Sequence, residues 1–347
     1  MGSSAAARTR PGHAPGEPGG APSDRVLLTA LARVLDHAGA GAPVAVARRA
    51  SQLASSFPLE ELRVTLRGGG ELRLAFKRLH PAARSPSARL AKPGFLLDPQ
   101  REPLVYSKLA LAAPSGPPHC YGSAPGFAAG ERWLFLEWVS GRELYQVGEL
   151  ELWERAARWL GELHAAFAPE IEEHLAGARL IDHDAAYYRR WVERARWFAP
   201  GHPCAREAGR FLDRLRRRYD AVVEALLELP RTLLHGDFYA SNVLVSGGAD
   251  EPRVAALDWE MAAAGPGLMD LAALLSGRWT DAERELLTAA YDSCAGVAPF
   301  ERRQLELARL ALAIQWLGWA PSGWAPPRAQ RHDWLADAVM LAERLGV

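Results

Sequence analysis

The stretch HGDFYASN at residues 235–242, followed by ALDWE at residues 256–260, is the part of the sequence that constrains the fold most. It places Asp237 five residues before Asn242 and puts Asp258 at the end of the next short apolar segment. Two pieces rich in β-forming residues flank a Gly-Gly turn, which predicts a short hairpin. We therefore expect the side chain of Asp258 to face those of Asp237 and Asn242 across that hairpin.

These residue types suit phosphoryl transfer. The reaction needs one carboxylate that orients an attacking hydroxyl and accepts its proton, and oxygen ligands that hold Mg²⁺ against the phosphates of a nucleotide. Asp237 suits the first task, and Asn242 with Asp258 suits the second. An HxD tripeptide by itself is common, and a capped turn is the plainer interpretation of residues 235–237. The hypothesis therefore depends on the spacing of the whole set.

The sequence changes in character near Gly141. Before it, residues 62–66 and 71–76 alternate polar and apolar side chains around three glycines, which predicts a hairpin, and residues 133–138 predict another strand. After it, the pattern is mainly helical, so the whole order is typical of an α+β fold. The helices predicted from apolar spacing cover residues 24–39, 99–111, 150–167, 185–198, 207–229, 281–295 and 301–319.

With these motifs in order, the chain resembles the aminoglycoside phosphotransferase and choline kinase family, whose signature HGDxxxxN is followed by a strand ending in D-W/F-E/D. The resemblance covers roughly residues 44–345. It implies an α+β, protein-kinase-like bilobal fold, with a small N-lobe made of an antiparallel sheet plus a helix and a larger, mainly helical C-lobe. We expect the N-lobe in residues 24–139 and the C-lobe in residues 140–347.

Residues 1–23 hold no large apolar side chain after Met1, which predicts a disordered tail.

The nucleotide-binding elements of the family have counterparts in this chain. Lys77, at the end of a predicted strand, corresponds to the lysine that positions the phosphates, and Glu102, on the next predicted helix, corresponds to its ion-pair partner. Leu136, Glu137 and Trp138 form the expected hinge, whose backbone would pair with adenine. The plainer alternatives are a solvated lysine at a strand end, a first-turn helix charge and an ordinary strand end.

The chain lacks the Gly-rich loop that protein kinases place between their first two strands. In its place, residues 50–58 offer small side chains, among which Ser55 and Ser56 could contact phosphates through hydroxyl and N–H groups. A plain polar turn is an equal alternative. The three glycines at residues 68–70 fit a hairpin turn better than a phosphate-binding loop.

Two further residues have roles that the resemblance implies. His235 is expected to hydrogen-bond near the metal-binding segment and not to act as the base. Asp270, in the sequence MDLA at residues 269–272, corresponds to the acid that braces the catalytic loop in the family. Both are therefore expected to support the site rather than to take part in the reaction.

The acceptor site is the least defined part of the prediction. In the family it is built from C-lobe helices, where this chain has aromatic and basic side chains, although helically spaced aromatics more often pack in a core. A polycationic aminoglycoside calls for carboxylates, whereas residues 181–229 carry more arginines than acids. A macrolide, a sugar, an amino alcohol or a peptide hydroxyl therefore stays open as the acceptor. The acceptor-site candidates are Tyr187, Tyr188, Arg190, Trp191 and Trp316.

The composition limits the partners and the cellular compartment that we expect. The 41 basic and 41 acidic residues cancel, which argues against nucleic acid as a partner, and the three cysteines are far apart, which argues against disulfides and a thiolate metal site. No apolar stretch is long enough to cross a bilayer, so we expect a cytoplasmic protein without a membrane partner. The oligomeric state is not indicated.

We therefore predict a Mg²⁺-dependent phosphotransferase that uses ATP or GTP and a small molecule with a hydroxyl group as its acceptor. One alternative has the same chemistry but acts on Ser or Thr hydroxyls of a peptide or protein. A second alternative is a catalytically silent nucleotide-binding module, which the intact set of charged residues disfavours.

Overall fold

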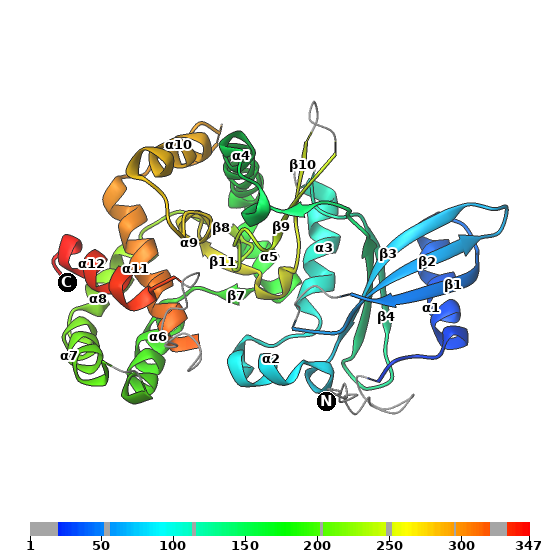
Figure 1. Ribbon diagram of the computed structural model, residues 1–347, viewed down its shortest axis with the longest axis horizontal. Helices are drawn as coiled ribbons and strands as arrows, with labels where there is room; N and C mark the ends of the chain where they lie inside the picture. Colours follow the sequence, from blue (N-terminus) through cyan, green and yellow to red (C-terminus); the bar gives the residue numbers. More distant parts are fainter. Residues whose placement is uncertain are drawn as a thin grey trace, which may run out of the picture. The chain divides into compact units, whose positions relative to one another are not determined.

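The computed structural model describes residues 20–51, 56–112, 116–201, 204–247, 252–294, 296–319 and 332–347. The contacts within it divide the chain into two units, drawn with their helices and strands labelled in Figure 1. The first unit takes the chain up to Ser85 and also Tyr121–Glu137, and the second takes Pro86–Cys120 and Trp138–Val347.

The first unit is built on a sheet with the strand order β1-β2-β3-β5-β4 in the described residues. β2 and β3 form the hairpin that the alternating pattern predicts, with Leu62 opposite Leu74 and Val64 opposite Leu72. Three buried residues, Leu62, Val64 and Leu74, and the partly buried Leu72 therefore fix the register on one face. The elements are β1 (Pro43–Ala50), β2 (Leu59–Leu66), β3 (Glu71–Leu79), the 3₁₀ helix η1 (Pro81–Ala83), β4 (Cys120–Pro125) and β5 (Arg132–Glu137).

Helix α1 (Asp24–His37) packs against this sheet and closes the core of the first unit (Figure 1). Its N-cap is Ser23, one residue before the start of the helix, and Arg48 on β1 donates a hydrogen bond to the carbonyl oxygen of Pro22 at 2.5 Å. Residues 20–23, which fall in the expected tail, therefore include the cap of α1 and a contact with β1. The rest of the expected tail, residues 1–19, lies outside the described residues.

The second unit is mainly helical, and α11 packs against α6, α9 and α12 at its centre. Among its described residues, two small sheets, β10-β9-β6 and β7-β11-β8, are formed by segments between the helices. The helices are α2 (Pro86–Ala91), α3 (Arg101–Ala112), α4 (Leu150–Phe167), α5 (Ile171–Ala178), α6 (Ala185–Phe198), α7 (Ala205–Arg216), α8 (Tyr219–Leu227), α9 (Leu268–Leu274), α10 (Asp281–Asp292), α11 (Arg302–Trp319) and α12 (Trp334–Leu345). The strands are β6 (Arg142–Glu143), β7 (Ile181–Asp182), β8 (Arg231–Leu234), β9 (Val243–Ser246), β10 (Arg253–Ala256) and β11 (Ala263–Pro266). The 3₁₀ helices are η2 (Gly94–Leu96), η3 (Leu144–Gln146), η4 (Ala168–Glu170), η5 (Ala199–Gly201) and η6 (Trp259–Met261).

One predicted helix is divided. The apolar spacing over residues 207–229 predicts a single helix, but α7 ends at Arg216 and α8 begins at Tyr219. Both helices pack on α6, and the break lets each bury its own apolar face there. Tertiary packing therefore overrides a continuous local pattern at this point.

The helix expected near residues 99–111, with the strands of the N-lobe, is α3. It groups with the second unit and packs against α5 and η6. The α+β class is confirmed. None of the described helices combines the length and the apolar character that a bilayer span requires.

Candidate active site

The HGD loop (residues 235–242) connects β8 to β9 in the second unit. The Nδ2 atom of Asn242 donates to the main-chain oxygen of Asp237 at 2.8 Å and to Asp237 Oδ2 at 3.0 Å. The backbone N–H of Tyr239 donates to the Asp237 carbonyl, and that of Asn242 donates to the Tyr239 carbonyl, both at 2.8 Å. The five-residue spacing therefore closes a tight loop in which the acid and the amide are in direct contact.

The DWE turn (residues 258–261) lies against this loop. The backbone N–H of Leu257 donates to the carbonyl of Asn242 at 2.8 Å, because β9 and β10 pair antiparallel just beyond both residues. Asp258 has φ 64° and ψ 62°, a left-handed conformation that is uncommon for a residue with a side chain. Such a conformation is often kept at functional sites, where the surrounding structure holds it in place.

Asn242 and Asp258 provide the donor atoms that Mg²⁺ prefers. The Nδ2 atom of Asn242 is used on Asp237, which turns the Oδ1 atom of the amide away from that carboxylate. Among the described residues, no cluster of three His, Cys, Asp or Glu side chains could hold a metal by itself. One amide oxygen and one carboxylate suit a Mg²⁺ ion, because this ion usually takes its remaining ligands from water and phosphates.

The surroundings of Asp237 favour its protonated form. The pKa of Asp237 is raised to about 7, mainly by burial; the nearby carboxylates of Asp258 and Glu260 also raise it, whereas Lys92 and the hydrogen bond from Asn242 lower it. The carboxyl group therefore titrates near neutral pH, where a general acid–base group works best.

His235 and Asp270 hold the HGD loop. His235 is fully buried; its Nε2 atom is 2.8 Å from the carbonyl oxygen of Leu257, and its Nδ1 atom accepts the backbone N–H of Asp237 at 3.3 Å. These contacts fit the neutral tautomer that carries its proton on Nε2. Asp270, on α9, accepts the backbone N–H groups of His235 and Gly236 at 2.5 and 2.9 Å. Both ring nitrogens of His235 are thus engaged in structural contacts.

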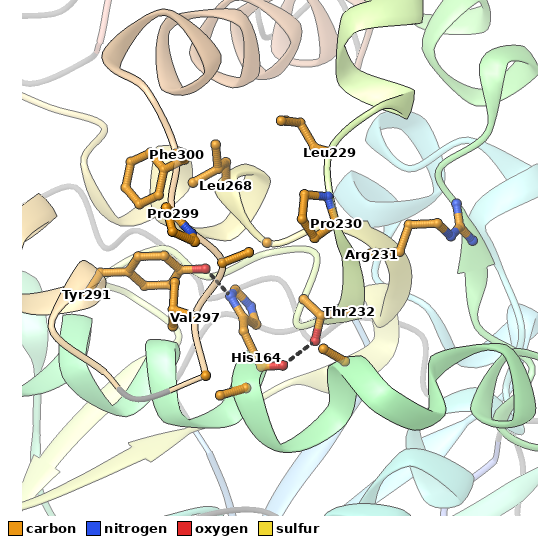
Figure 2. Close-up of a pocket in the computed structure, with 15 residues that line it drawn as sticks. His164, Leu229, Pro230, Arg231, Thr232, Leu268, Tyr291, Val297, Pro299 and Phe300 are labelled. Atoms are coloured by element: carbon orange, nitrogen blue, oxygen red, sulfur yellow. Dashed lines mark hydrogen bonds between the residues drawn. The ribbon is translucent and has the colours of Figure 1, made fainter.

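A small cavity of about 70 Å³ lies beside His164, Thr232 and Tyr291 (Figure 2). Its wall includes His164 of α4, whose Nδ1 atom is 2.8 Å from the hydroxyl of Tyr291 and whose Nε2 atom is 3.4 Å from Asp270 Oδ2. Thr232 donates its hydroxyl hydrogen to the carbonyl of His164 at 2.7 Å. The cavity has no motif residue in its wall, so we assign it to the structural support of the loop.

The predicted nucleotide-binding residues are distributed over both units. Lys77 lies on the central strand β3, where it exposes 5% of its surface and its ammonium is 5.9 Å from the ring of Phe57. It is therefore not a solvated strand-end lysine. Glu102, in the first turn of α3 in the second unit, exposes 1%. The ion pair between them stays a prediction.

The structure describes the expected hinge but only one of the two serines expected to contact phosphates. Leu136 and Glu137 end β5, and Trp138 begins the second of the two segments that make up the second unit. Ser56 accepts the backbone N–H of Ser85 through its carbonyl oxygen at 3.1 Å. Ser55 lies outside the described residues.

The acceptor candidates on α6 differ in accessibility. Tyr188 and Trp191 each expose only 1% of their surface, and the hydroxyl of Tyr187 donates to Gln315 at 3.1 Å. Little of these three side chains is accessible to a substrate, because they pack in the core between α6 and α11. Arg190 is exposed, with its guanidinium 4.3 Å from the centre of the Phe95 ring.

Trp316, on α11, is the acceptor candidate that contacts the HGD loop. Its indole N–H donates to the hydroxyl of Tyr239, two residues after Asp237. The Trp316 ring also stacks on Trp334 of α12 at 5.4 Å between centroids and lies 5.8 Å from the ring of Trp319. Trp316 and Trp319 are half-buried, so each keeps an accessible part.

The excess of arginines in residues 181–229 has another explanation. Arg189 pairs with Asp220 at 2.7 Å, and Arg196 pairs with Asp213 at 2.7 Å. Arg194 donates to the carbonyl of Gly318 at 2.8 Å. These arginines neutralise or hold neighbouring groups, so their number says little about the charge of the acceptor.

Three residues near the motif were given no role from the sequence. Lys92, Arg101 and Glu260 are buried together in the second unit, next to the DWE turn. Two weak signals were present in the sequence: only three of the 41 basic residues are lysines, at positions 77, 92 and 108, and Glu260 is part of the DWE motif itself.

The model of the phosphotransferase enzyme family, APH, matches residues 63–308. The chain therefore belongs to this phosphotransferase family, and the predicted family and enzyme class are confirmed. No curated protein sequence matches the chain significantly.

Solved structures of similar fold cover most of the chain. The GDP complex of wild-type aminoglycoside 2'-phosphotransferase-IIIa is 15% identical, with 93% of this chain and 98% of that chain covered and a TM-score of 0.55. Macrolide 2'-phosphotransferase MphH from Brachybacterium faecium is 18% identical, with coverage of 86% and 98% and a TM-score of 0.55. An ethanolamine kinase of Plasmodium vivax is 12% identical, with coverage of 87% and 82% and a TM-score of 0.55. At these identities the likeness shows the fold, which is the kinase-like fold expected.

Proposed function

We propose that this protein transfers the γ-phosphoryl group of ATP or GTP to a hydroxyl group of a small molecule, with Mg²⁺ bound beside the nucleotide. The observation that carries the proposal is the contact of Asp237 with Asn242 in a loop against which the turn containing Asp258 packs. Membership of the phosphotransferase family and a structural neighbour solved with GDP support a nucleotide as the donor.

In the proposed reaction Asp237 orients the acceptor hydroxyl and accepts its proton. The hydroxyl oxygen forms a bond to the γ-phosphorus while the bond from that phosphorus to the β-phosphate oxygen breaks, and the nucleoside diphosphate leaves. A pKa of Asp237 near 7 suits this role at neutral pH. Asn242 and Asp258 would hold Mg²⁺, which when bound neutralises charge on the phosphates. Lys77 would contact the phosphates.

The rings beside the HGD loop favour a small molecule over a peptide as the acceptor. Trp316 contacts Tyr239 and stacks on Trp334, so aromatic rings cover one side of the loop two residues from Asp237. A planar or apolar molecule gains contact area on such rings with little loss of conformational entropy. An extended peptide would instead need a long open groove.

A phosphorylation panel tests the acceptor class. The protein is incubated with MgCl₂, γ-labelled ATP or GTP, and in turn an aminoglycoside, a macrolide, an amino alcohol, a sugar and a Ser/Thr peptide, and the products are detected by mass. Transfer of label to a small molecule supports the proposal. Transfer to the peptide alone would contradict it in favour of a protein kinase.

The role of Asp237 can be tested with an isosteric variant. Asp237→Asn should lower turnover by about 100-fold or more and leave nucleotide affinity nearly unchanged, because it removes the proton acceptor but keeps the shape. Asp213→Asn, at an exposed ion pair on α7, is the matched control and should be neutral. Near-normal turnover of Asp237→Asn would remove Asp237 from its catalytic role.

A further inference from the structure

A buried ion pair joins two distant segments of the second unit next to the proposed metal site. The ammonium of Lys92, between α2 and η2, contacts the carboxylate of Glu260 in the DWE turn. The two side chains are only 7% and 9% exposed. The Lys92 ammonium also lies 5.9 Å from the ring of Trp319. Lys92 is thus enclosed by the DWE turn on one side and by α11 on another.

A second buried cation, Arg101, also contacts Glu260. The Nη1 atom of Arg101, at the start of α3, donates to the main-chain oxygen of Glu260 at 2.7 Å and to that of Leu96 at 2.8 Å. Its Nε atom donates to the main-chain oxygen of Arg179 at 2.8 Å. Arg101 is 5% exposed, and burial lowers its pKa. Glu260 is therefore held by its side chain from Lys92 and by its backbone from Arg101.

Glu260, which both cations contact, lies next to the residues proposed to bind the metal and to catalyse the reaction. Glu260 is two residues after Asp258, whose left-handed backbone conformation begins the DWE turn. The next residue, Met261, places its carbonyl oxygen 2.0 Å from where a side chain on Gly236 would begin, so the turn is packed tightly on the HGD loop. A shift of Glu260 would therefore move both the carboxylate of Asp258 and the loop that carries Asp237.

Stability alone does not explain this arrangement. Removing two charges from water is costly, and well-packed apolar residues of similar volume usually serve a fold equally well or better. Two buried cations that converge on one residue of a turn instead provide a defined geometry, as hydrogen-bonded groups behind metal ligands commonly do.

We propose that Lys92 and Arg101 are positioning residues that act through Glu260: they fix the DWE turn so that the carboxylate of Asp258 stays in place for the divalent cation that accompanies the nucleotide. This inference rests on the proposed function. It assigns to the α2–α3 segment, and not only to the motif, a part in metal binding.

The test removes the contacts of Lys92 and Arg101 with Glu260, here called the clamp, without changing the net charge. The variants are Lys92→Met/Glu260→Gln, which removes both charges, and Arg101→Lys, which keeps the charge but loses the forked hydrogen bonds. Calorimetry measures the affinity for the β,γ-imido analogues of ATP and GTP with MgCl₂ and, separately, with EDTA. The ratio of the two dissociation constants gives the gain that Mg²⁺ provides.

We expect both variants to reduce the Mg²⁺-dependent gain about tenfold, while the affinity in EDTA stays within about twofold. The matched control is Arg189→Met/Asp220→Asn, which also removes an ion pair without changing the charge but joins exposed residues of α6 and α8. It should leave the Mg²⁺-dependent gain as in the wild type.

Three outcomes overturn the inference. An unchanged Mg²⁺-dependent gain in either folded variant would show that the clamp does not position Asp258; if the double variant does not fold, Arg101→Lys decides. A third variant, Lys92→Met alone, is measured in the same way, and a larger gain in it would show that Glu260 is itself a metal ligand that Lys92 masks. A wild-type protein that binds the analogue equally well with and without Mg²⁺ would instead refute the metal site of the proposed function, and this inference with it.

Discussion

Gly236 shows how a single residue makes the site possible. Its φ of 78° lies in the left-handed region, and a Cβ atom there would meet the carbonyl oxygen of Met261 at 2.0 Å. Both the backbone conformation and the close approach of the DWE turn therefore require the absence of a side chain. The glycine of the HGD motif is thus explained by packing rather than by chemistry.

Gly236→Ala should consequently destabilise the protein by about 2 kcal/mol or more and abolish activity, because the turn and the loop must move apart. The matched control is Gly209→Ala inside α7, where a Cβ atom meets nothing within 4 Å. That change should be neutral or stabilise by up to about 1 kcal/mol. Denaturant unfolding of the two variants compares them, and equal stabilities would contradict the packing argument.

Helix α10 illustrates the contribution of a cap at the scale of an element. The hydroxyl oxygen of Thr280 accepts the backbone N–H of Glu283 at 3.2 Å, and the Glu283 carboxylate accepts the backbone N–H of Thr280 at 2.8 Å. This reciprocal pair satisfies two N–H groups that would otherwise lack a partner at the helix start. Because α10 also supplies Tyr291 to His164, its position bears on the support of the HGD loop.

Thr280→Ala should lower the free energy of unfolding by about 1 kcal/mol, the usual cost of losing an N-cap. Thr280→Ser keeps the hydroxyl group and serves as the control, for which we expect a change of only a few tenths of a kcal/mol. Urea unfolding measures both. A Thr280→Ala variant as stable as the Thr280→Ser variant would show that the cap is dispensable.

At the scale of the whole molecule, the proposed function links stability to ligand. A nucleotide that binds only the folded protein stabilises it by mass action, by about 2.7 kcal/mol at a concentration 100 times the dissociation constant. The melting temperature of the wild type should therefore rise with ATP or GTP, and it should rise further when MgCl₂ replaces EDTA. In Asp258→Ala the extra rise with MgCl₂ should disappear, because one metal ligand is lost. An identical response of the variant and the wild type to MgCl₂ would remove Asp258 from the metal site.

The sequence by itself determined what depends on local pattern and on short spacing. The apolar periodicity over residues 150–167 and 185–198 coincides with α4 and α6, because a helical face repeats every few residues whatever it packs against. The five residues between Asp237 and Asn242 leave few ways to close the loop. The motif with its strand-then-helix order was therefore sufficient for the fold class and the family.

The tertiary structure alone decided which distant residues meet. Lys92 and Glu260 are 168 residues apart, and Arg101 and Glu260 are 159 apart, so no periodicity or spacing could indicate their contact. The division of the predicted helix at residues 207–229 and the burial of Tyr188 have the same origin, since both follow from packing on other helices. A local pattern records which side chains are apolar, whereas the partner that each side chain meets depends on the path of the whole chain.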